Sequence, residues 1–448
     1  MNFGLESYVG LILYVVGIVV LLATLLWRPI VGMYYLVPLI PLQTVRYRLN
    51  DFPLGGSVIG IMVVAMAVGA MRRGQPILPK TSLSRIVLVY AGFTFVSLWL
   101  GMMYLGSDLP IFGEVRFDMW QEYILMPALL LMVVAIQPTR RQMMVLVLLM
   151  CLAGLSMDRS FNSEVAGKDF SKFSNDLRDA GGSMGYAGIN GLAAFEAQFT
   201  TFVLAIAAFE RRRLLRLAYW GLAAFSASCL MYALSRGAYV ALLIGVLFLG
   251  IVKQRKLLVL MGVFALTAAT IVPPAVIERV QMTSKGDGEL DHSAETRLTL
   301  WEDAMQLFDS NVVTGTGFNT YAFMHRVGSY EDTHNFYLKV MVETGVLGLL
   351  LFFALVTKMF RAGFRLFRKS KDPFFQSLGL GLTGWMVAAL TASLFGDRWM
   401  YFQIAGFMWV LAGMVVRATI IEDAAVTDEG AERSGAENIG EPQVAAAV

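Results

Sequence analysis

The sequence predicts an all-α, polytopic integral membrane protein with about 12–13 transmembrane helices and one large loop outside the membrane. Hydrophobic residues make up 57% of its 448 residues and charged residues only 15%, whereas soluble domains average roughly 45–50% and 25%. Apolar stretches of about 20 residues recur along the chain, and this length crosses a hydrocarbon core of about 30 Å. Together these observations indicate a bundle of membrane-spanning helices.

Thirteen apolar stretches are candidate spans. Ten of them precede the longest polar segment: 8–27, 29–42, 54–71, 85–105, 122–137, 140–157, 188–209, 213–233, 236–252 and 256–273. Three follow it: 335–357, 374–395 and 399–417. The second stretch is short and the eighth and ninth are barely separated, so twelve or fourteen spans remain open. The chain therefore divides into two transmembrane parts (1–273 and 335–417), a large loop between them (274–334) and a tail (418–448).

The tail has a composition unlike that of the spans. It is rich in Ala, Gly and acidic residues and carries one basic residue, Arg433. Such a segment cannot bury a hydrophobic core, so residues 418–448 are predicted to form a disordered, acidic cytoplasmic end.

The distribution of Lys and Arg predicts the orientation in the membrane, because basic residues favour the inner side. With the N-terminus outside, the inner connections include dense basic clusters at 211–216, 253–256 and 358–371, with almost no acidic residue beside them. The outer segments are longer, and their basic residues are mixed with Asp and Glu. The large loop is thus predicted to lie outside, together with a second long segment at 158–187.

Residues 294–308 of the large loop are predicted to form an amphipathic helix. Ser293 is a plausible N-cap, and apolar residues recur at helical spacing at Leu298, Trp301, Met305 and Phe308. Residues 314–318, with two glycines, then supply a tight turn.

All three histidines of the chain lie in this loop, at His292, His325 and His334. His334 stands where the loop ends and the next span begins. An imidazole there is suited to proton transfer near neutral pH at a membrane surface. Asn335 follows directly, and Glu343 lies a little over two helical turns further on.

Two arginines are predicted to reach the same surface. Arg236 lies at the outer junction of two spans, and Arg297 lies in the first turn of the loop helix. Guanidinium groups bind phosphate oxygens bidentately and keep their charge. With His334, they suit a lipid-linked diphosphate: the cations would stabilise the leaving oxygen, and the neutral imidazole would take a proton from an acceptor hydroxyl. This chemistry requires no metal and no cofactor.

Each candidate also has a structural interpretation. Arg236 could anchor the chain at the interface, and Arg297 could lie on a solvated helix face. His334 could be an interfacial side chain satisfied by a hydrogen bond. Glu343 could pair with Lys339, four residues earlier on the same helix face.

Two acidic features are left outside the candidate site. Glu196, within the seventh span, is expected to pair with a neighbouring helix. The alternating acids Asp287, Glu289 and Asp291 resemble a calcium loop, but the glycine after the third ligand and the closing glutamate are absent. No metal site is therefore predicted.

Four segments, in this order, resemble motifs of a known family: 234–239, 296–301, 315–318 and 334–348. The series is similar to the O-antigen ligase and O-antigen polymerase superfamily, bacterial membrane glycosyltransferases with one large periplasmic loop before the last few helices. The motif-bearing part covers roughly residues 190–400. Members commonly have twelve spans with both ends inside, whereas this sequence predicts thirteen with the N-terminus outside.

The resemblance implies a GT-C-like enzyme of the bacterial inner membrane, with its active site facing the periplasm. Such enzymes move a glycan from undecaprenyl diphosphate to an acceptor hydroxyl in lipopolysaccharide or exopolysaccharide biosynthesis, without a metal and with inversion. Carried over residue by residue, Arg236 and Arg297 would bind the diphosphate, His334 would activate the acceptor, and Asn335 and Glu343 would shape the site. The implied partners are the donor, the acceptor and membrane lipids, with no nucleic acid.

Alternative functions remain open on sequence alone. A polysaccharide polymerase or a protein O-oligosaccharyltransferase differs from a ligase only in its acceptor. A transporter of polar lipids is a different class, and it predicts repeated halves and ionisable groups deep in several spans. The sequence has no internal repeat at a fixed period, and its polar features gather at the outer surface.

Overall fold

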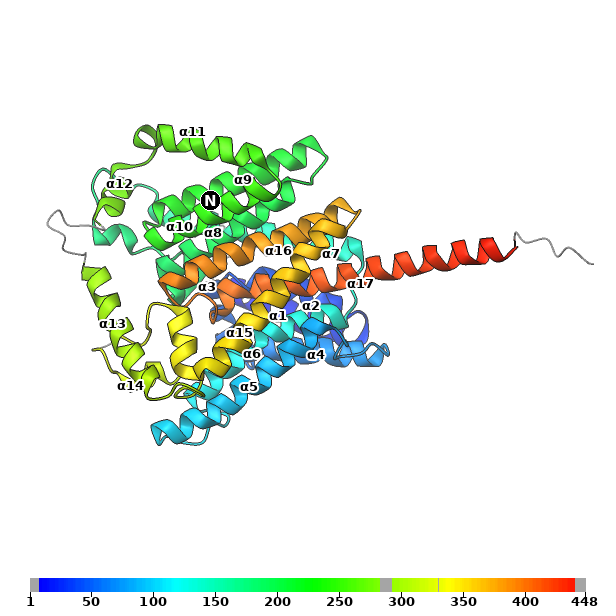
Figure 1. The fold of residues 1–448 in the computed structure, drawn as a ribbon, viewed down its shortest axis with the longest axis horizontal. Helices are drawn as coiled ribbons and strands as arrows, with labels where there is room; N and C mark the ends of the chain where they lie inside the picture. The colour runs from blue at the N-terminus through cyan, green and yellow to red at the C-terminus, as the bar shows by residue number, and fades with distance from the viewer. Residues whose placement is uncertain (1–7, 283–291, 329, 440–448) are drawn as a thin grey trace, which may run out of the picture.

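Helices form the regular structure of the computed structural model, which describes residues 8–282, 292–328 and 330–439 (Figure 1). Within these ranges the chain contains no strand. The protein is an all-α polytopic membrane protein, as the sequence predicts.

The helices follow one another along the chain with short connections. Those before the large loop are α1 (Val9–Leu26), α2 (Ile30–Leu39), α3 (Gln43–Tyr47), α4 (Val58–Arg72), α5 (Ser82–Leu105), α6 (Val115–Ala135), α7 (Arg140–Val165), α8 (Gly188–Ala207), α9 (Arg213–Tyr232), α10 (Arg236–Val252) and α11 (Arg255–Ile271). The loop contains α12 (Pro274–Gln281), α13 (His292–Asp309) and α14 (Tyr321–Met324), and it is followed by α15 (Phe336–Lys369), α16 (Pro373–Ala392) and α17 (Phe402–Ile439). Short 3₁₀ turns include η4 (Asn175–Arg178) and η6 (Ser393–Phe395).

A helix occupies each of the thirteen predicted stretches, but not all are long enough to cross a membrane unaided. Among the described residues, 10 helices are long and apolar enough, or up to 11 if α11 and α12, bent by 107°, form one span. α2 and α10 are shorter. α2 has only 10 residues and contains Pro38, and a proline removes a helix hydrogen bond and disfavours continuation.

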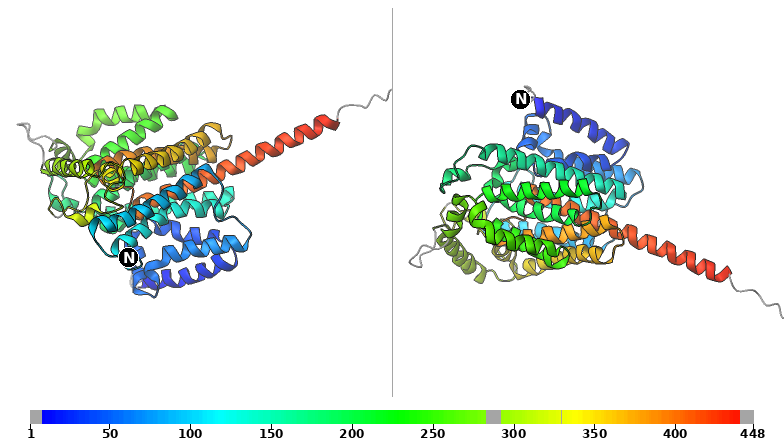
Figure 2. Two further views of the ribbon diagram at one scale, coloured as in Figure 1. Left: turned by 60° about the horizontal axis from the view of Figure 1, so that its bottom comes forward. Right: turned by 90° about the horizontal axis from the view of Figure 1, so that it is seen from above.

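The bundle has two chemically different ends (Figures 1 and 2). The end that holds α12, α13 and α14 is here named the loop end. The opposite end, named the basic end, holds the connections at 211–216 and 253–256. There, Arg417 Nε donates to the carbonyl of Pro138 at 3.4 Å, and Lys253 Nζ lies 4.6 Å from the centroid of the Phe209 ring.

Polar caps fix where helices begin at the basic end. Thr139 and Gln142 form a reciprocal capping box at the start of α7. Asp372 accepts a hydrogen bond from the N–H of Phe374 at the start of α16, and it also forms an ion pair with Arg140. These contacts satisfy N–H groups that have no partner within their own helix.

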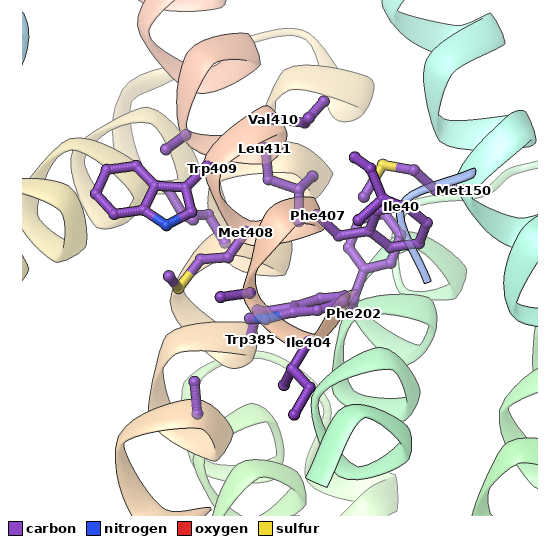
Figure 3. Packing of buried hydrophobic residues seen from close by; sticks show 14 of the residues in the cluster. Ile40, Met150, Phe202, Trp385, Ile404, Phe407, Met408, Trp409, Val410 and Leu411 are labelled. Atoms are coloured by element: carbon purple, nitrogen blue, oxygen red, sulfur yellow. The ribbon is translucent and has the colours of Figure 1, made fainter. Parts of the chain in front are cut away.

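The core of the bundle is centred on α8, of whose apolar window 94% is buried. Aromatic rings from α8, α16 and α17 pack there: the ring centroids of Phe202 and Trp385 are 6.0 Å apart, and those of Trp385 and Phe407 also 6.0 Å (Figure 3). α1 is the opposite case, with 17% of its window buried. Such exposure of an apolar helix suits contact with lipid.

Two sequence-based expectations require correction. α17 continues to Ile439, so residues 418–439 are helical rather than disordered (Figure 1). Ala and Glu are strong helix formers, and here they extend a helix that is already nucleated by its buried part. The predicted loop helix at 294–308 is present as α13, but it begins at His292, so Ser293 lies inside it rather than at its N-cap.

Candidate active site

α15 is broken near its start, and the break organises the site. Asn335 caps the helix, because its side-chain oxygen accepts the N–H groups of Tyr337 at 3.0 Å and Leu338 at 3.4 Å. Gly345 then leaves the helical region, with φ 65° and ψ −170°. The single predicted span at 335–357 is therefore two helical segments, a short one before Gly345 and a long one after it.

The segment 312–317 fills the break. The N–H groups of Thr316 and Gly317 donate to the carbonyls of Val342 and Glu343 at 3.0 and 2.7 Å, and the N–H of Val346 donates to the carbonyl of Val312 at 2.9 Å. Backbone groups freed by the break are thus paired, which a buried site requires.

Glycine is needed on both sides of this contact. A Cβ at Gly345 would lie 2.2 Å from the carbonyl oxygen of Val313, and one at Gly315 would lie 2.4 Å from the backbone of Glu343. Both glycines also have positive φ, a region that side chains disfavour. The predicted turn at 314–318 is therefore a backbone clamp on α15.

Glu343 serves this clamp. Its carboxylate accepts the backbone N–H groups of Asn319 at 2.9 Å and Tyr321 at 3.1 Å, and the residue is 2% exposed. Its expected ion pair with Lys339 is not formed, since the ammonium of Lys339 lies 3.0 Å from a carboxylate oxygen of Asp397 instead.

His334 stands at the entrance to the short segment, with its side chain 37% exposed. Its φ is 52°, an uncommon conformation for a residue other than glycine. Asp332 holds it there: Oδ1 of Asp332 accepts the backbone N–H of His334 at 3.0 Å, and Oδ2 lies 3.6 Å from Nδ1 of the imidazole. A carboxylate at Nδ1 favours the tautomer in which Nδ1 carries the proton and Nε2 can accept one.

Asp332 is ionised under ordinary conditions. Burial raises the pKa of Asp332, but the hydrogen bond with His334 and the charge of Lys339 outweigh burial and hold that pKa at about 2. The N–H of Asp397 also donates to Oδ2 of Asp332, at 3.3 Å. The imidazole therefore faces a permanent negative charge.

Beneath His334 lies a buried ion pair. The side chains of Lys339 and Asp397 are 8% and 3% exposed. The second oxygen of Asp397 accepts the N–H groups of Trp399 at 3.3 Å and Met400 at 3.1 Å. Each charge is compensated, as a buried charge must be.

Arg297 reaches this region through α13. Trp301, one helical turn after Arg297, donates its indole N–H to the carbonyl of Thr333 at 3.1 Å, next to His334. Residues four apart share a helix face, so the face that carries Arg297 is turned toward the entrance of α15. Arg297 itself is half-buried.

Arg236 reaches the loop end from another element. It is the first residue of α10, two residues after Leu234, whose φ is 52°. Leu234 is buried against Leu177 of η4 and Val276 of α12, so both long segments at the loop end hold this elbow. Gly237 packs on Phe395, two residues before Asp397, since a Cβ there would lie 2.7 Å from the Phe395 side chain.

The structure thus brings Arg236, Arg297 and His334 to one end of the bundle, each joined to the others through intermediate residues. Of the other two histidines, His325 is exposed, and His292 is the first residue of α13. The acids Asp287, Glu289 and Asp291 lie outside the described residues.

Residues 221–353 match the family model described as O-antigen ligase. This segment belongs to the O-antigen ligase superfamily. No curated protein matches the chain. The O-antigen ligase segment contains α10, α13 and the broken start of α15, and therefore Arg236, Arg297 and His334. This match supports the interpretation of the protein as an O-antigen ligase-like membrane glycosyltransferase.

Two acidic residues near His334 were not identified from the sequence. Asp332 lies within the O-antigen ligase segment, and Asp397 contacts that segment through Asp332. Asp332 stands two residues before His334, and this spacing suits a side chain that accepts the N–H of His334. Asp397 lies beyond the matched segment, in the short connection between α16 and α17. The sequence signal that could have identified Asp397 is an acidic residue in a short connection between two apolar helices at the loop end.

Glu196 has a specific neighbour. It is fully buried in α8, and it interacts with Asp158 of α7, which accepts a hydrogen bond from the Ser226 hydroxyl at 2.7 Å. The neighbouring helix was expected, but a second carboxyl was not. Two neighbouring negative charges in such a place are costly, so we expect the pair to share a proton.

Proposed function

We propose that this protein transfers a glycan from undecaprenyl diphosphate to an acceptor hydroxyl at the loop end of the bundle. We further propose that it resides in the bacterial inner membrane with this end facing the periplasm. The basic connections at the opposite end support this orientation, because Lys and Arg favour the cytoplasmic side.

The donor's diphosphate binds at Arg236 and Arg297. Both are half-buried, so their charges act in a medium of lower dielectric than water. Arg297 is the sixth residue of α13, two residues further from the helix start than the sequence predicts. When the bond between the sugar's anomeric carbon and the diphosphate oxygen breaks, these cations stabilise the leaving diphosphate.

His334 acts on the acceptor. Asp332 occupies the Nδ1 side of the imidazole, so Nε2 takes the proton of the acceptor hydroxyl as its oxygen forms the new bond to the anomeric carbon. The undecaprenyl diphosphate leaves from the opposite face, which inverts the configuration. Asn335 and Glu343 are positioning residues, since they hold the backbone on either side of the short segment.

The single observation that carries this proposal is the Asp332–His334 pair, which is joined to α13 through Thr333 and to the elbow that carries Arg236 through residues 395–397. A metal is not required, since cationic side chains supply the charge.

Reconstitution tests the proposal. The purified protein in lipid nanodiscs is given an undecaprenyl-diphosphate-linked glycan with three acceptors: a lipid-A core, a polysaccharide and a peptide. Mass analysis of the products identifies the acceptor and separates a ligase from a polymerase or a protein glycosyltransferase. Movement of the donor across sealed vesicles without any product would instead identify a transporter, and inhibition by EDTA would reveal a metal requirement.

A further inference from the structure

The connection between α16 and α17, residues 396–401, is firmly anchored. Trp399 is 1% exposed, and its ring lies 6.3 Å from that of Phe336 and 5.1 Å from that of Phe352. On the other side, the hydroxyl of Tyr337 donates to the carbonyl of Leu390 at 2.7 Å. A short connection held in this way keeps its side chains in fixed positions.

This connection touches both halves of the candidate active site. Phe395, just before it, packs on Gly237 beside Arg236. Asp397, within it, donates its N–H to Asp332, the partner of His334. Residues 396–401 therefore connect the elbow of α10, through Phe395, with the entrance of α15, through Asp397.

Arg398 is the cationic side chain in that position. Its guanidinium folds back over Gly396: a Cβ at residue 396 would lie 2.9 Å from Nη2 and 3.2 Å from Cζ. Nη1 makes one long contact, 3.5 Å, to the carbonyl of Asp397. The residue is half-buried.

The acids nearest to Arg398 are already engaged. The carboxylate of Asp397 pairs with Lys339 and accepts two backbone N–H groups. That of Asp332 holds His334. In the part of the chain that the structure describes, no carboxylate forms an ion pair with Arg398. Within the described residues, the guanidinium is thus a cation that makes one long hydrogen bond to the protein.

We propose that Arg398 is a further substrate-binding residue, which binds a phosphate or carboxylate oxygen of a substrate. This inference rests on the proposed function. Guanidinium favours such oxyanions because two of its N–H groups match two oxygens. The oxyanion comes either from the donor's diphosphate or from an acidic group of the acceptor, and the two sources predict different kinetics.

The variants are R398Q, which removes the charge, and R398K, which keeps the charge but loses the paired N–H groups of the guanidinium. R159Q is the matched control, since Arg159 is an exposed arginine on the last turns of α7 at the same end. Gel filtration and thermal unfolding establish that each variant folds.

Transfer in nanodiscs gives KM for donor and for acceptor separately, with inorganic pyrophosphate as a competing anion. We expect R398Q to raise one of the two KM values about tenfold, the effect of losing one charge-assisted hydrogen bond. R398K should fall between R398Q and R159Q. A raised donor KM with weakened pyrophosphate inhibition assigns the diphosphate, and a raised acceptor KM with unchanged inhibition assigns the acceptor.

Three results separate the hypotheses. If R398Q equals R159Q in both KM values and in pyrophosphate inhibition, Arg398 binds neither substrate. If its effect appears in nanodiscs with anionic lipid and vanishes in zwitterionic lipid, Arg398 binds a headgroup and the inference is overturned. If wild type and R159Q form no product with any acceptor, the proposed function itself fails.

Discussion

The backbone N–H of Asp397 donates to Oδ2 of Asp332 at 3.3 Å, across 65 residues of sequence. This hydrogen bond joins the connection between the last two helices to the residue that orients His334. It makes the position of the imidazole depend on a part of the chain beyond the O-antigen ligase segment.

The Asp332 carboxylate is expected to matter through its charge. D332N keeps an oxygen for the N–H of His334 but loses the charge at Nδ1, so kcat should fall at least about tenfold, a part of what a general base contributes. KM for the donor should stay constant. Because the pKa of Asp332 is held at about 2, below its usual value of about 3.9, the carboxylate is lost only when the pH falls through about 2. Transfer rates from pH 6 to 9 should therefore show the same deficit throughout, and recovery at high pH would contradict this role.

Removal of His334 should abolish transfer without unfolding the protein. H334A is expected to lower kcat by about 10² to 10⁴-fold, the usual contribution of a general base. H325A is the matched control, because His325 is exposed in the same loop. Product formation and thermal unfolding are measured for both, and equal rates in the two variants would remove the catalytic role.

The Lys339–Asp397 pair should be sensitive to loss of one partner. K339M leaves a buried carboxylate without its cation, and D397N leaves a buried ammonium without its anion. Each is expected to cost about 3–5 kcal/mol of stability. Unfolding of the purified protein in detergent measures the cost, and K339M/D397N should be less destabilised than the sum of the single variants. Strict additivity would mean that the two charges do not interact.

Gly345 is expected to tolerate no side chain. G345A combines a positive φ, which costs about 1–2 kcal/mol, with a collision at the carbonyl of Val313. We expect a loss of more than about 2 kcal/mol and faster proteolysis of residues 312–317. G262A is the control, since a Cβ at Gly262 of α11 meets nothing within 4 Å. Similar stability of the two variants would show that the clamp is loose.

The Asp158–Glu196 pair should require its proton rather than its charge. E196Q replaces a protonated carboxyl by a group of the same shape that can still donate, so it should change stability by less than about 1 kcal/mol. E196K places a cation among apolar side chains and should prevent folding or insertion. Infrared spectra of the wild type should contain a protonated-carboxyl band that E196Q loses, and its absence from wild type would contradict the shared proton.

Much of the fold could be predicted from the sequence, because lipid imposes long apolar helices and these are visible as hydropathy. The broken start of α15 could not. Glycine is common in membrane helices, so Gly345 alone carries no signal. The break depends on hydrogen bonds with 312–317, which only the folded chain brings together. The helical tail beyond residue 418 was missed for a different reason, because charge and composition outweighed helix propensity in the prediction.

The placement of the candidate site could be predicted in part. Arg236, Arg297 and His334 could be assigned to one end of the bundle, since each stands at a boundary between apolar and polar segments, and their roles stay predictions. Asp397 could not be connected with His334, because the contact spans three helical segments. Sequence spacing also explains why an ion pair between Glu343 and Lys339 was considered, because residues four apart on a helix favour such a pair. Only the folded chain shows that Lys339 pairs with Asp397 instead.

The break in α15 separates the imidazole from the helix that crosses the lipid. The short segment is fastened to residues 312–321 and to the connection at 396–401, whereas the long segment packs along α16 and α5. A thicker or thinner bilayer changes the tilt of a spanning helix, and a continuous helix would pass that tilt directly on to His334. With the break in place, a change of tilt in the long segment reaches the reacting groups less directly.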